Sequence, residues 1–109
     1  KALELAVLIY EVTKSFPTEE KFGITSQMRR SSVSTSSNIA EGSARNSSKA
    51  FCNCLDISLG ESFELETQLI IAFRTGILPE EKFSLLSREI AELQKMVIGF
   101  KNTVEANPY

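Results

Sequence analysis

The sequence predicts an all-α fold, a single-domain antiparallel up-down-up-down four-helix bundle that spans residues 1–109. Apolar residues recur at spacings of three and four along most of the chain, as they do on the buried face of a helix. The connections between these periodic segments are short, so successive helices should pack antiparallel. No segment shows a competing strand pattern. We place the helices at about residues 1–15, 19–42, 48–75 and 79–105.

The last two predicted helices have the clearest periodicity. Pro79 and the two glutamates after it are typical of a helix start, and a sustained seam follows at Phe83, Leu86, Ile90, Leu93, Val97, Phe100 and Val104. Ser47 or Ser48 can cap the preceding helix, and Gly76 is its expected end. That helix should bury Phe51, Leu55, Leu59, Leu65, Leu69 and Phe73.

The first predicted helix is apolar around most of its circumference. Its polar residues form only a narrow stripe, interrupted by Leu8, at Lys1, Glu4, Glu11, Lys14 and Ser15. A helix in a monomeric bundle needs only one buried face, so the excess apolar surface predicts self-association. The alternative is that residues upstream of Lys1 cover this surface, because the chain does not begin with Met and we expect its natural N-terminus to lie further upstream.

The second predicted helix is made of small residues. The stretch "RSSVSTSSNIAEG" is rich in Ser and Thr, yet at helical spacing it continues two parallel stripes. One stripe contains Ile24, Met28, Ser32, Thr35 and Ile39, and the other contains Gln27, Arg30, Ser34, Asn38, Glu41 and Arg45. A loop has no reason to show two such stripes. We therefore predict a helix of low intrinsic propensity, held by tertiary packing and ending near Gly42.

Composition excludes several classes of function. The formal net charge of −2 weighs against binding nucleic acid through bulk positive charge. The chain has no histidine, which removes the commonest general base, and no cluster suited to a metal appears. Cys52 and Cys54 point about 200° apart on a helix and should be free thiols, as in a reducing cytoplasm. No apolar run is long enough to cross a membrane.

Two motifs resemble a known family. "FGITSQMRRSSVSTSSNIAEGSAR" and the later "LGESFELETQL" are similar to the four-helix bundle proteins also named for 23S rRNA intervening sequences. Members read FG-L-T-S-Q-[IM]-R-R-A-A-V-S-I-x-S-N-I-A-E-G and then L-G-S-L-x-E-L-E-T-Q-L. This chain has Ser31 and Ser32 where an alanine pair is usual, and Glu61 where Ser often stands. The resemblance covers essentially the whole chain.

The resemblance implies a homo-oligomer without enzymatic activity. Relatives assemble as homopentamers, so we expect a homopentamer here. One branch of the family assists a reverse transcriptase of retroelements as a basic accessory protein, and the acidic balance of this chain sets it apart from that branch. We predict no cofactor, no metal site and no membrane partner, and we infer no small-molecule substrate.

The polar residues of the middle helices have a structural and a functional interpretation. We predict a structural polar layer of Gln27, Arg29, Arg30, Asn38, Glu41, Glu64 and Glu66. Within it, Arg30 should form a buried ion pair with Glu66, or with Glu64 as the reserve partner. Asn38 and Glu41 are expected to cap the helix or to bond across a subunit interface; acid-base catalysis is the weaker alternative, and we assign no catalytic residue.

The function predicted from the sequence is that of a cytoplasmic, non-enzymatic scaffold or accessory protein with a protein or RNA partner. The alternative is a nucleic-acid-binding accessory module. It would use a local basic patch of Arg29, Arg30, Arg45 and Lys49.

Overall fold

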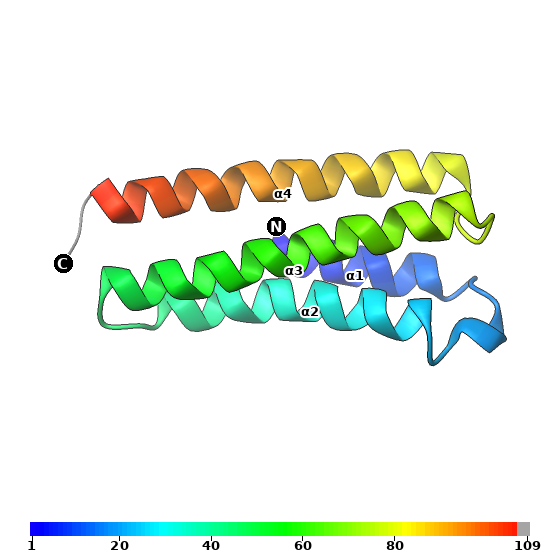
Figure 1. Ribbon diagram of the computed structural model, residues 1–109, viewed down its shortest axis with the longest axis horizontal. Helices are drawn as coiled ribbons and strands as arrows, with labels where there is room; N and C mark the ends of the chain where they lie inside the picture. The colour runs from blue at the N-terminus through cyan, green and yellow to red at the C-terminus, as the bar shows by residue number, and fades with distance from the viewer. Residues whose placement is uncertain (107–109) are drawn as a thin grey trace.

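Four α-helices pack in sequence order in the computed structural model, which describes residues 1–106 (Figure 1). They are α1 (Ala2–Thr13), α2 (Ile24–Ser43), α3 (Ser48–Arg74) and α4 (Glu80–Ala106), with a 3-10 helix, η1, at Thr18–Glu20. Each helix contacts the next one along the chain, and α1 also contacts α4. The all-α fold is confirmed, and residues 1–106 contain no strand.

The ends of α3 follow from local chemistry. The Ser47 side chain accepts a hydrogen bond from the Ala50 backbone N–H at 3.1 Å, which caps the first turn. At the other end, Gly76 has a φ of 79°. The backbone N–H groups of Gly76 and Ile77 donate to the carbonyls of Phe73 and Ala72, the double bond pattern that ends a helix at a left-handed residue. The predicted stop at Gly76 is confirmed.

The predicted start of the second helix is wrong. We placed it at residue 19, but residues 18–20 form η1 and the α-helix begins at Ile24. Pro17, Glu19 and Glu20 satisfy the rules for a helix start, and a single 3-10 turn uses the same signals. Gly23 then stands at the N-cap of α2. The other predicted bounds fall within about two residues of those observed.

The core runs along the middle of the bundle and follows the predicted periodicity. Leu86, Ile90, Leu93, Val97 and Val104 of α4 are buried, and so are Leu55, Leu65 and Leu69 of α3. Phe100 departs from the predicted seam because it is 52% exposed, and its ring packs edge-on against Phe51 with centroids 5.3 Å apart.

The second helix does pack through small residues. Ser31, Ser32 and Thr35 are at most 1% exposed, and Met28 of the same inner stripe is fully buried. The hydroxyl of Ser58 in α3 donates to the Thr35 carbonyl at 2.8 Å, a direct hydrogen bond between the two helices. Near the end of α2, a Cβ added at Gly42 would lie 2.8 Å from the Cβ of Cys54. Small residues therefore let α2 and α3 approach closely.

Candidate interaction surfaces

The predicted polar layer does not form one layer. Gln27 and Glu41 are exposed on α2, whereas Asn38 is half-buried and donates to the Ser34 carbonyl one turn earlier at 2.8 Å. Glu41 pairs with Arg45, also one turn away. These contacts lie within α2 or at its end, so they stabilise that helix locally and do not connect it to another helix.

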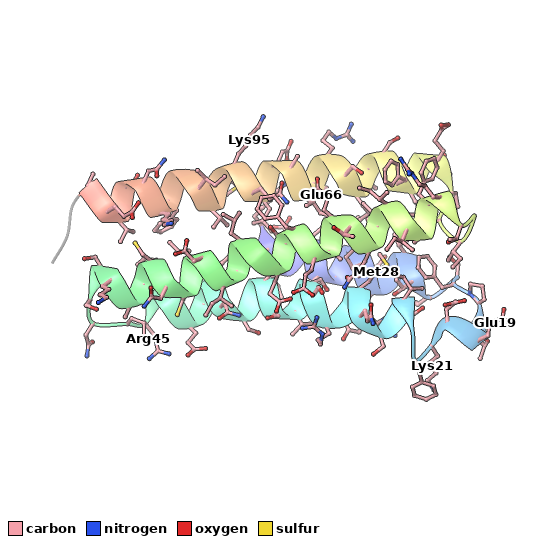
Figure 2. The ribbon with its side chains drawn as sticks, in the orientation of Figure 1. Glu19, Lys21, Met28, Arg45, Glu66 and Lys95 are labelled. Atoms are coloured by element: carbon pink, nitrogen blue, oxygen red, sulfur yellow. The ribbon has the colours of Figure 1, made fainter. Side chains whose placement is uncertain are left out.

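Arg30 is a surface residue, and the predicted buried ion pair is wrong. Its guanidinium lies 3.4 Å from Glu64 and 3.5 Å from Glu61, and its side chain is 56% exposed. Glu66 lies on the side of α3 that faces α4 (Figure 2), and it forms no ion pair within residues 1–106. Arg30 therefore pairs at the surface with Glu64, the predicted reserve partner, and with Glu61.

The exposure of Arg30 predicts a small effect of its removal. An ion pair between exposed side chains contributes about 0–1 kcal/mol because water and salt screen it. We expect Arg30→Ala to lower the free energy of unfolding by no more than about 1 kcal/mol. Thermal melts at low and high salt would test this. A loss of several kcal/mol would mean that Arg30 is buried by a partner.

Arg29 joins α2 to α1. Its Nε donates to the Thr13 hydroxyl at 2.8 Å, and its guanidinium lies over the Tyr10 ring, 4.6 Å from the centroid. Thr13 in turn donates to the Ile9 carbonyl at 2.7 Å. A guanidinium stacked on an aromatic ring is held in place by both charge and contact area. Arg29 therefore fixes the position of α1 against α2.

The predicted basic patch is divided between the two ends of α2. Arg29 and Arg30 lie near its start, whereas Arg45 and Lys49 lie around the α2–α3 turn, on the order of 20 Å away along the helix. Figure 2 shows Arg45 at the opposite end of the bundle from Lys21. Arg30 and Arg45 are also paired with carboxylates. The four residues do not form a continuous cationic surface.

The remaining charged contacts lie at the margins of α4. The Lys1 ammonium lies 3.0 Å from Glu92 and 3.1 Å from Glu89, and these two hydrogen bonds raise the pKa of Lys1. The same contact lowers the pKa of Glu92. Lys101 pairs with Asp56 at 2.6 Å, which raises the pKa of Lys101. These pairs fasten α4 to α1 and α3.

The cysteines of residues 1–106 show no activated thiol and belong to no metal-binding cluster. Cys52 and Cys54 are free, and burial raises the pKa of the Cys52 thiol, which keeps it protonated near neutral pH. Within residues 1–106, no group of three His, Cys, Asp or Glu side chains is placed to hold a metal ion. None of the helices in this part of the chain is both long and apolar enough to span a membrane.

The most prominent surface feature is exposed apolar area. Leu3, Val7 and Tyr10 of α1 are 68%, 51% and 42% exposed, in one outward stripe. The outward side of α3 exposes four further large apolar side chains, Ile57, Phe63, Ile70 and Ile71, and α4 exposes Met96, Ile98 and Phe100. The apolar excess of the first helix was visible in the sequence. We did not single out the α3 face, because its apolar residues alternate with Asp56 and Glu64.

Comparison with known proteins identifies the family to which this chain belongs. No curated protein sequence matches the chain. A crystal structure from Bacteroides thetaiotaomicron, described as a protein with unknown function from the S23 ribosomal protein family, is similar to it with a TM-score of 0.86 and 31% sequence identity. The match covers 93% of this chain and 91% of that one. Residues 1–99 match the family described as 23S rRNA-intervening sequence protein. The chain therefore belongs to the 23S rRNA-intervening sequence protein family.

Proposed function

We propose that the protein is a non-enzymatic, homo-oligomeric scaffold or accessory protein that acts in the cytoplasm. The exposed apolar stripe of Leu3, Val7 and Tyr10 carries this proposal, because a soluble monomer rarely leaves a contiguous apolar stripe uncovered. Two free cysteines fit a reducing compartment. Neither the family nor the similar structure is described with a reaction.

The assembly we propose is a homopentamer that presents its surface to a protein or RNA partner. The number five comes from the family resemblance. The apolar faces of α1 and α3 support an assembly in which each copy contacts two others. Direct binding of nucleic acid is the weaker alternative, because the basic residues are divided between two ends of α2 and half of them are paired with carboxylates.

Light scattering coupled to size exclusion tests the assembly. At micromolar concentration we expect a mass of about 60 kDa, five copies of the 12.1 kDa chain. Val7→Glu should shift the protein to smaller species without loss of helical circular dichroism, because it places a charge in the apolar stripe. Ser37→Glu, at an exposed position of α2, is the matched control and should leave the mass unchanged. A 12 kDa wild-type species would contradict the proposal.

A binding assay with a nucleic-acid duplex of random sequence, at physiological salt, distinguishes the proposed scaffold function from the nucleic-acid-binding alternative. Affinity that rests on phosphate contacts falls steeply as salt rises. We expect weak binding, and a sub-micromolar affinity that fell with salt would favour the nucleic-acid module.

A further inference from the structure

Two exposed apolar faces lie on different sides of the bundle. One is the α1 stripe of Leu3, Val7 and Tyr10, and the other is the outward face of α3, with exposed side chains at Ile57, Phe63, Ile70 and Ile71. Within residues 1–106, the backbone of α1 lies beside those of α2 and α4 but not beside that of α3. Figure 1 shows α3 in front and α1 behind, so the two helices lie on different sides of the bundle.

A glycine stands in the middle of the α3 face. Gly60 is exposed inside a long helix, and a Cβ added there would meet no atom within 4 Å. Glycine destabilises a helix relative to alanine, and no contact within the protomer requires it at this position. A glycine between exposed Ile57 and Phe63 does allow the backbone of another helix to approach closely. The position of Gly60 therefore favours helix packing from outside the protomer.

The α1 stripe and the α3 face run in the same direction and lie at the same level along the bundle axis. α1 and α3 run in the same direction, because each is antiparallel to α2. Lys1 and Leu55 line the same hollow, so α1 begins level with Leu55. Both helices rise by the same amount per residue. Leu3 is therefore level with Ile57, and Val7 is level with Gly60 to within about one residue.

From this match we infer that α1 of one copy packs against α3 of the next, with Val7 beside Gly60. This inference rests on the proposed self-association and specifies its interface. The two faces are different surfaces, so the contact is heterologous, and its repetition closes a ring when each copy is turned by the same fraction of a full turn about an axis parallel to the helices. Each copy then uses its α1 face on one neighbour and its α3 face on the other.

Charge at the edge of the faces supports a second copy as the occupant. Lys14 continues the α1 stripe one turn after Tyr10 and forms no ion pair within residues 1–106. Lys14 lies about one turn beyond the level of Glu64 on the neighbouring α3, an offset that the long lysine side chain can span. The Glu64 side chain is 55% exposed, so it remains open to a second cation besides Arg30.

The apolar area also fits this interface. A stable interface buries about 800 Å² on each partner, of which somewhat over half is apolar. Three large side chains on α1 and four on α3, each 39–68% exposed, offer on the order of 300–400 Å² of apolar area per face. One such contact is marginal for a dimer. A ring in which every copy makes two contacts is stabilised by its closure.

Cysteine cross-linking tests the pairing directly. The background is Cys52→Ser with Cys54→Ala, which removes the native thiols, and the probes are Leu3→Cys and Ile57→Cys with a short bis-maleimide. Chains carrying both probes should cross-link into a ladder. A co-expressed mixture of the two single variants should give covalent dimers only, and either single variant alone should give none. Dimers from Leu3→Cys alone would indicate an α1–α1 contact and overturn the inference.

A pair of glycine variants tests the close approach at Gly60. Gly60→Leu should weaken assembly at least about tenfold in dissociation constant, while the chain remains helical. Gly99→Leu is the matched control: Gly99 is also exposed within a helix and open on all sides, but it lies on α4. Equal loss of assembly in both variants would contradict the inference, and so would no loss in Gly60→Leu.

The two proposals fail in different ways. An oligomer that forms without Leu3–Ile57 cross-links overturns this interface and leaves the proposed self-association standing. A monomer at every concentration overturns both.

Discussion

Gly42→Leu should lower the free energy of unfolding by about 3 kcal/mol, at the upper end of the cost of overpacking a core. A Cβ at this position would lie 2.8 Å from the Cys54 Cβ and 2.9 Å from the Phe51 ring, and leucine adds three more carbons. The crowded atoms belong to a buried helix face, so relief requires α2 and α3 to separate. Chemical denaturation at one fixed protein concentration measures the loss, since assembly also contributes to apparent stability.

Alanine variants show whether crowding is the cause. Gly42→Ala should still destabilise the protein, although alanine is favoured over glycine in a helix by about 1 kcal/mol. Gly99→Ala meets no atom within 4 Å and should gain most of that preference. If Gly42→Ala and Gly99→Ala were equally stabilising, α2 and α3 would be further apart than the structure shows.

Leu65→Ala should cost about 2–5 kcal/mol, the range for removing a buried leucine side chain. Leu65 is fully buried in the middle of α3, where the surrounding helices cannot easily collapse into the space. Ile98→Ala is the control, because Ile98 is 43% exposed on α4 and its loss should cost about 0.5 kcal/mol. The urea unfolding midpoints of the two variants measure these two losses of stability. A loss of less than about 1 kcal/mol for Leu65→Ala would place that residue outside the core.

The parts of the fold that the sequence predicted correctly are those set by repetition. The buried leucines of α3 and α4 recur over many turns, so an error at one position, such as exposed Phe100, leaves the pattern intact. The start of α2 depends on a single local signal. Pro17 and the acidic residues after it favour either a 3-10 turn or an α-helix, and only the packed chain decides between them.

The partner of Arg30 could not be predicted because it depends on the rotation of α3 about its axis. Glu61 and Glu66 are separated by about 140° around that axis, so only one of them can face α2, and the rotation of α3 decides which. The buried neighbours of α3 set this rotation, and they place Glu61 and Glu64 beside Arg30. The apolar stripe in the sequence shows which side of α3 faces the core. It does not show which residues at the edges of that stripe face α2 and which face α4.

The composition of α2 has a consequence for the order of folding. Its inner face is made mainly of serine and threonine, whose side chains compete with the helical backbone for hydrogen bonds. Thr35 and Ser32 donate to carbonyls of their own helix. An isolated peptide of residues 24–43 would therefore remain largely coil in water. α2 acquires its helical form from the surface of α3, so we expect the α3–α4 hairpin to form before α2 docks.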